Sequence, residues 1–112
     1  MAVKTVGGLG FMTFDIAAST GAGTVTAWRT LGAPVVANKI HGTATFSGTT
    51  GTMKLYGKLS SNSTAATLLI TRTQAQRSAV IASTVATAVN FLRVGSTKLT
   101  GGAGTMYVAV LP

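Results

Sequence analysis

Side chains able to do acid–base chemistry are scarce in this chain of 112 residues. It has one acidic residue, Asp15, one histidine, His41, and no cysteine. A paired-carboxylate mechanism needs two acids, and no serine here has the glycine-flanked setting of a nucleophile elbow. We interpret His41, which precedes Gly42 at the start of a strand, as a histidine in a turn or at a sheet edge. The sequence therefore predicts a protein that is not an enzyme.

Metal and cofactor sites are equally short of ligands. Zinc takes three or four Cys, His or carboxylate groups, and calcium takes clustered carboxylates. One His and one Asp supply neither set within one copy of the chain. The glycines of residues 7–10 lack both the Lys-Ser/Thr ending of a P-loop and the strand–turn–helix setting of a dinucleotide site. We expect no metal and no cofactor.

The sequence is strongly basic. Nine Lys and Arg residues against one acid give a net charge of +8. Such a surplus favours nucleic acid, an anionic membrane or an acidic protein as partner. The basic residues are spread along the chain and form neither a tail nor a basic amphipathic helix, which favours an acidic protein surface. The candidate contact residues are Arg29, Lys54, Tyr56, Lys58, Arg72, Arg77 and Arg93.

One predicted strand carries a basic–aromatic–basic face. Lys54, Tyr56 and Lys58 alternate with the apolar positions of residues 52–59, the pattern of a half-buried strand. Such a face could stack on single-stranded nucleic acid, but a solvated outer face of a sandwich is the interpretation we favour. Trp28 and Arg29 must point to opposite faces of a strand. We expect Trp28 in the core and Arg29 at the surface, with an interface role for Trp28 as the alternative.

Alternating apolar and polar residues predict an all-β fold. Glycine-rich residues 47–51 predict a hairpin between strands 41–46 and 52–59, and residues 101–104 predict a hairpin between strands 90–94 and 105–111. Residues 74–89 could form a helix, but their β-branched content favours strand and loop. Short, regularly spaced strands predict an antiparallel β-sandwich, jelly-roll or Ig-like, of about six to eight strands. The other predicted strands are 23–29, 34–40 and 66–72.

The chain is expected to hold one sandwich domain. Residues 1–22 are predicted to be an N-terminal arm or the first strand, and residues 23–112 the β-sandwich.

Hydrophobic residues make up 46% and charged residues 9%, against roughly 25% charged in ordinary domains. This composition predicts surface that is covered by neighbouring subunits. No apolar run reaches the ~18 residues of a membrane span, so no membrane partner is expected, and the N-terminus does not resemble a signal peptide.

Two stretches resemble small β-sandwich virion proteins of tailed bacteriophages. Residues 41–48 (HGTATFSG) lead into the alternating strand 52–60, and residues 90–94 (NFLRV) lead through the glycine-rich segment 99–105 to residues 106–111. The resemblance covers most of residues 23–112. It implies a structural virion protein, assembled in the host cytoplasm.

A head decoration (cement) protein is the first expectation from this resemblance. Its partner would be the major capsid protein or another virion protein, and it would act as a homo-oligomer, of which a trimer is one form. The first alternative is a tail, collar or head-fibre component that acts as an adaptor or binds the host. The second is a nucleic-acid-binding β module that uses Lys54, Tyr56 and Lys58, which we regard as the weaker expectation.

Overall fold

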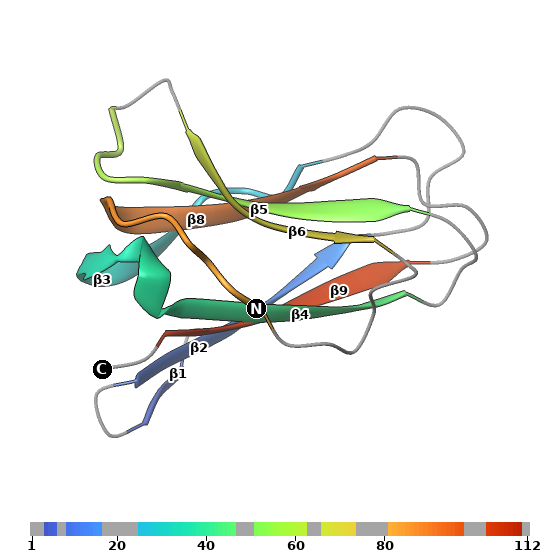
Figure 1. The fold of residues 1–112 in the computed structure, drawn as a ribbon, viewed down its shortest axis with the longest axis horizontal. Coiled ribbons are helices and arrows are strands. Elements are labelled where there is room, and N and C mark those ends of the chain that lie inside the picture. The colour runs from blue at the N-terminus through green and yellow to red at the C-terminus, as the bar shows by residue number, and fades with distance from the viewer. Residues whose placement is uncertain are drawn as a thin grey trace.

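In the part of the chain that the structure describes, nine strands form two antiparallel sheets that pack face to face (Figure 1). This computed structural model describes residues 4–6, 9–16, 25–46, 51–62, 66–73, 81–97 and 103–110. The five-stranded sheet has the order β1 (Lys4–Val6), β2 (Leu9–Ile16), β9 (Gly104–Val110), β4 (Ile40–Phe46), β7 (Ile81–Ala82). The four-stranded sheet has the order β3 (Arg29–Val36), β8 (Ala88–Ser96), β5 (Thr52–Lys58), β6 (Thr67–Thr73).

The strand order is that of a jelly roll. Strands β2 to β9 form two four-stranded layers, β2-β9-β4-β7 and β3-β8-β5-β6, and β1 adds a short edge strand beside β2. Two sheets built from eight strands in this order are the double-sheet jelly roll. The predicted antiparallel β-sandwich is confirmed, and the order selects the jelly-roll form over the Ig-like form.

Both predicted hairpins are wrong. β4 and β5 lie in different sheets, as do β8 and β9, so the segments that join them cross from one sheet to the other. Alternation shows which side chains of a strand face the core. Strands of both sheets have the same alternation, so it does not show to which sheet a strand belongs. The consecutive strands that do pair are β1 with β2 and β5 with β6.

The segment before β4 also differs from the expectation. Residues 23–29 and 34–40 were predicted as two strands, whereas one strand, β3, continues through a register shift between Thr30 and Val35. Gly32 lies within this irregularity with φ of +84°, a conformation that glycine adopts at little cost. A short 3₁₀ helix, η1 (Ala37–Lys39), then leads into β4. Residues 81–89 contain β7 and the start of β8 and no helix, while residues 74–80 lie outside the described part of the chain.

The core lies between the two sheets and draws on strands of both. From the five-stranded sheet, β2, β4 and β9 supply inward side chains, and from the four-stranded sheet β5, β6 and β8 do so. Gly57 is needed on β5 because a Cβ there would lie 2.9 Å from atoms of both Leu69 on β6 and Val89 on β8, the two strands that flank β5. The largest fully buried side chains are Phe14, Met12, Ile40, Met53, Leu55, Leu92, Met106, Val89, Val94 and Val108.

A candidate docking face on the four-stranded sheet

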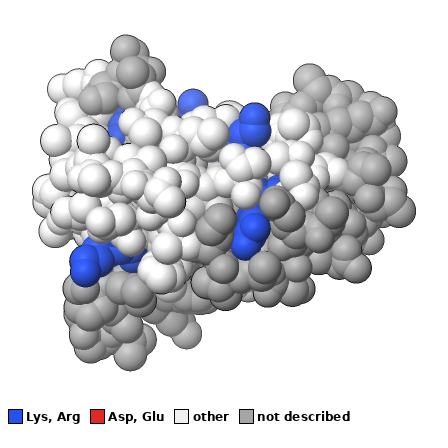
Figure 2. Space-filling model, in the orientation of Figure 1, with Lys and Arg blue, Asp and Glu red and all other residues white. Residues whose placement is uncertain are grey.

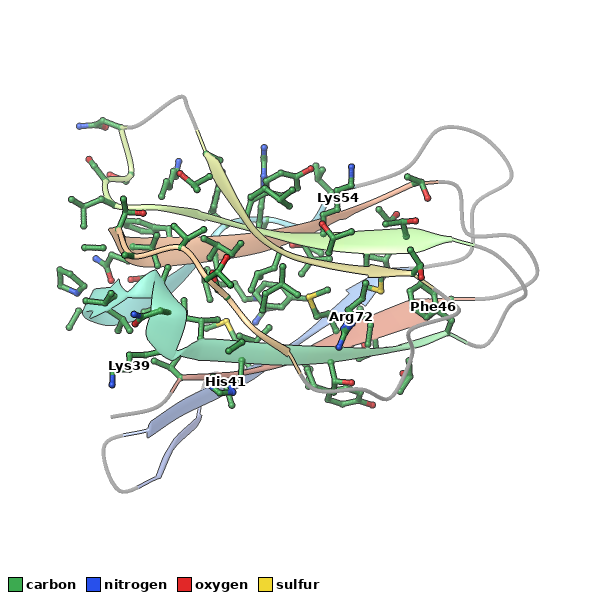
Figure 3. All side chains as sticks on the ribbon, in the orientation of Figure 1. Lys39, His41, Phe46, Lys54 and Arg72 are labelled. Carbon is green, nitrogen blue, oxygen red and sulfur yellow. The ribbon has the colours of Figure 1, made fainter. Side chains whose placement is uncertain are left out.

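The outer face of the four-stranded sheet gathers aromatic and cationic side chains from three neighbouring segments. On β5, the inward residues Met53, Leu55 and Gly57 are buried. The alternate residues of the strand therefore face outward, as predicted. Figure 3 shows Lys54 pointing from β5 away from the other sheet.

Strand register places further members of this face beside β5. Lys58 pairs with Phe91 and Tyr56 pairs with Arg93 on β8. Side chains directly opposite each other in neighbouring strands lie on the same face of the sheet. We call the resulting surface the cation–aromatic face, and it consists of Trp28, Lys54, Tyr56, Lys58, Phe91 and Arg93.

Trp28 is the centre of the contacts on this face. The Lys58 ammonium nitrogen lies 4.4 Å from the centroid of the Trp28 ring, and the Arg93 guanidinium carbon lies 4.6 Å from it. Lys58 also lies 6.0 Å from the centroid of Phe91 and donates a hydrogen bond of 3.3 Å to the carbonyl of Ser61. Each distance to a ring is within the range of a cation–π interaction. Two cations therefore share one indole ring.

Thr26 fixes the segment that carries Trp28. Its N–H donates to the carbonyl of Val94 at 2.8 Å, and its hydroxyl oxygen accepts a hydrogen bond from the Val94 N–H at 3.0 Å. These bonds hold residues 25–28 alongside β8 ahead of β3. Trp28 is thereby set across from Arg93, since the neighbouring Arg29 pairs with Leu92.

The expected placement of Trp28 and Arg29 is reversed in the structure. Trp28 is only partly buried and lies with Lys58 and Arg93 on the outer face. Arg29 pairs with the buried Leu92, and its guanidinium lies 5.6 Å from the ring of Phe14 on the opposite sheet. Alternation places the two side chains on opposite faces, but it does not say which face is inner. Arg29 begins β3, which is an edge strand of its sheet. A long arginine side chain can pack its aliphatic part against the core at such an edge, while the Trp28 ring lies on the outer face.

Exposed apolar side chains lie on the strands beside the cation–aromatic face and after the end of β5. Leu68 on β6 pairs with Tyr56 and is 44% exposed. Leu59, predicted as the last inward residue of its strand, instead follows β5 and is 52% exposed. Val25, which bridges to Gly95 of β8, is 61% exposed. By register Leu68 and Val25 lie on the outer face, where exposed apolar side chains are typical of an interaction surface.

Two further candidate contact residues lie away from this face. Arg72 on β6 pairs with the inward Met53 and is only 6% exposed. Figure 3 shows it reaching from β6 toward β4 in the space between the sheets. Arg29 also lies on the inner side, and Arg77 lies outside the described residues. The structure thus brings together Lys54, Tyr56, Lys58 and Arg93, but not Arg29 and Arg72.

The one acidic side chain of the chain lies on the opposite sheet. Asp15 is exposed on β2 and accepts a hydrogen bond of 2.8 Å from the hydroxyl of Thr105 on β9. The cation–aromatic face therefore carries no carboxylate side chain. The side of the molecule visible in Figure 2 has several separate groups of Lys and Arg atoms and no visible Asp or Glu.

His41 also belongs to the five-stranded sheet, on β4 between β9 and β7, so contrary to the expectation it lies neither in a turn nor at a sheet edge. It pairs with Ala82 on β7 and Ala109 on β9. Within the described residues, no three His, Cys, Asp or Glu side chains gather where they could hold a metal ion. No helix in the described ranges is long and apolar enough to span a membrane.

Comparison with known proteins gives a similarity of fold. No protein-family model matches this chain, and no curated protein matches it. The carbohydrate-binding module CBM32 of AlyQ, solved in complex with 4,5-unsaturated mannuronic acid, is similar with a TM-score of 0.56 at 14% sequence identity, covering 92% of this chain and 76% of that chain. PirA is similar with a TM-score of 0.46 at 15% identity, covering 86% and 90%. The similarity to the CBM32 supports the β-sandwich architecture.

Phe91 is a member of the face that the sequence pattern does not indicate, and Trp28 is a member for which an interface role is only the alternative to a core position. The β5 stripe is visible as alternation within a single strand. Its neighbours are joined to it only by the pairing of β5 with β8 and of β3 with β8. Phe91 and Arg93 do stand two residues apart, and this spacing puts them on one face of any strand. That signal could have linked an aromatic and a cation, but it does not identify the strand they lie beside.

Proposed function

We propose that this chain is a non-catalytic structural component of a tailed-bacteriophage particle, and specifically a head decoration protein that binds and stabilises the shell. The observation that carries the proposal is the cation–aromatic face. It combines three aromatic and three cationic side chains with no acid. A surface of this kind is complementary to an acidic, partly apolar protein surface.

The residue types on the face are those that contribute most to protein–protein binding. Trp, Tyr and Arg are enriched among interface residues whose truncation costs the most affinity. Trp28, Tyr56 and Arg93 supply one of each, and exposed Leu68 extends the apolar area beside Tyr56. Burial of this area removes apolar surface from water, while the cations favour a negatively charged partner.

Several identical binding sites on the shell would give a high overall affinity even if each contact were weak. A shell presents the same acidic surface many times, and an oligomer of this chain, such as a trimer, would engage several copies at once. Linked sites raise the overall affinity without any new contact. The low content of charged residues, 9%, fits a chain whose surface is partly covered by neighbouring subunits.

The experiment that tests this function is a count of copies in purified particles. Quantitative mass spectrometry of intact virions is expected to find on the order of hundreds of copies per particle, as a site repeated over the whole shell requires. About six or twelve copies would instead place the protein at a symmetric vertex, neck or tail. Absence of the protein from purified particles would refute the virion proposal.

A host-facing glycan-binding component is the second candidate. One observation favours it: the similar fold of the CBM32 of AlyQ was solved with an acidic sugar derivative, and the cation–aromatic face here is positively charged. A panel of neutral and acidic oligosaccharides tests this candidate directly. Selective binding of acidic oligosaccharides, together with a location at one vertex of the particle, would favour it over decoration.

A further inference from the structure

We infer that Lys58 and Arg93 form, beside the ring of Trp28, a binding site for the carboxylate of an acidic side chain on a partner protein. This inference rests on the proposed docking function and names the chemistry of its central contact. The site is a defined part of the cation–aromatic face, and its three members come from β5, β8 and the segment ahead of β3.

Strand register brings the two cations together. Because Lys58 is opposite Phe91 and Tyr56 is opposite Arg93, Lys58 and Arg93 are diagonal neighbours on β5 and β8. Diagonal neighbours on one face of a sheet are within reach of each other when their side chains are long. Both charged groups contact the same ring, at 4.4 and 4.6 Å from its centroid.

The ring orders the cations without neutralising them. An indole face attracts a cation through its quadrupole but carries no net charge. The chain has a single acidic side chain, and Asp15 lies on β2 of the opposite sheet, bonded to Thr105. Two neighbouring positive groups with no acidic side chain on their face favour an incoming anion.

A carboxylate fits the donors that are present. The guanidinium of arginine presents a planar fork that matches a carboxylate, and the ammonium of lysine adds a point charge with freely directed N–H groups. The Nε atom of Arg93 is buried and has no hydrogen-bond partner among the described residues. The contact with Trp28 orients this guanidinium ahead of binding, which lowers the entropy cost of the contact.

An acidic protein side chain suits this site better than an acidic sugar. Sugar rings bind proteins by packing on an exposed aromatic face, and the Trp28 ring is already occupied by two cations. The exposed Leu68 beside Tyr56 offers an apolar contact to a protein partner instead. We therefore commit to a carboxylate supplied by Asp or Glu of a protein.

The test is a titration of the full chain with poly-L-glutamate at low salt. Trp28 is the only tryptophan, so its fluorescence reports binding at this site, and calorimetry measures the affinity independently. The variants are Lys58→Gln, Arg93→Gln and the matched control Lys39→Gln, an exposed lysine of η1 with the same change in charge. A thermal melt of each variant checks that it is folded.

We expect the two site variants to lose affinity roughly three- to tenfold each, and the control to lose less than about twofold. Three results would overturn the inference: no binding by the native chain, equal losses in Lys39→Gln and Lys58→Gln, or tighter binding of oligomannuronate than of poly-L-glutamate. The virion proposal fails on a different result, namely absence of the protein from particles, so the two failures are distinguishable.

Discussion

Trp28 and Arg93 face each other on the outer side of the four-stranded sheet, with the guanidinium carbon 4.6 Å from the centroid of the indole ring. Trp28 lies just ahead of β3 and Arg93 lies on β8, so the contact depends on the pairing of these segments. Lys58 reaches the same ring from β5. This cluster links the geometry of the sheet to the proposed docking function.

Replacement of Trp28 should weaken the cluster without unfolding the protein. Trp28→Ala removes the ring that Lys58 and Arg93 share, and each exposed cation–π contact contributes about 0.5–1 kcal/mol. We expect the free energy of unfolding in urea to fall by about 1–2 kcal/mol. Trp28→Phe keeps an aromatic face and should lose less. An equal loss in both variants would contradict a contribution from the aromatic face.

Thr26 should matter through its hydrogen bond to β8. Thr26→Val keeps the side-chain shape but removes the acceptor for the Val94 N–H, and an unsatisfied, partly buried donor costs about 1–3 kcal/mol. The control is Thr30→Val, whose hydroxyl accepts only from the exposed N–H of Gly32 and should cost less than about 0.5 kcal/mol. Chemical denaturation of both variants measures the difference, and similar costs would contradict the assigned role of Thr26.

Gly57 and Gly42 should differ in their tolerance of a methyl group. A Cβ at Gly57 would lie 2.9 Å from Val89 Cγ1, 3.2 Å from Val89 Cβ and 2.9 Å from Leu69 Cδ1, and a β-branched valine has little freedom to move. Gly57→Ala is therefore expected to destabilise the protein by about 1–3 kcal/mol.

At Gly42 the nearest atom is 3.2 Å away and is the Cδ1 end of the Ile70 side chain. Gly42→Ala should therefore cost less than Gly57→Ala. Thermal melts of the two alanine variants, compared with the native chain, measure the order. The opposite order would contradict the close approach of Leu69 and Val89 to Gly57.

Two leucines of the four-stranded sheet should separate core from surface. Leu92 on β8 is fully buried and Leu68 on β6 is 44% exposed. Leu92→Ala is expected to cost about 2–5 kcal/mol, because it leaves a cavity. Leu68→Ala should change the free energy of unfolding by no more than about 0.5 kcal/mol. If Leu68→Ala proved as costly as Leu92→Ala, the exposed apolar surface beside Tyr56 would have to be structural rather than available to a partner.

Sequence alone predicted the sandwich and one stripe of its surface. The stripe of Lys54, Tyr56 and Lys58 follows from a period of two within a single strand, a local property. The membership of Trp28 and Phe91 depends on which strands pair, and pairing in a jelly roll joins residues far apart in the chain. For the same reason glycine-rich residues 47–51 and 101–104 predict hairpins that the fold does not contain. Glycine permits a reversal of the chain but does not fix the sheet to which the next strand belongs.

The most direct test of the docking face is co-sedimentation with purified phage heads that lack the protein. The variants compared are the charge reversal Lys58→Glu/Arg93→Glu, a control reversal at the exposed Lys39, and the native chain, each first shown to be folded by a thermal melt. The account predicts saturable binding of the native chain and of Lys39→Glu, and a loss of binding in the double variant. Full binding by the double variant, or none by the native chain, would contradict it.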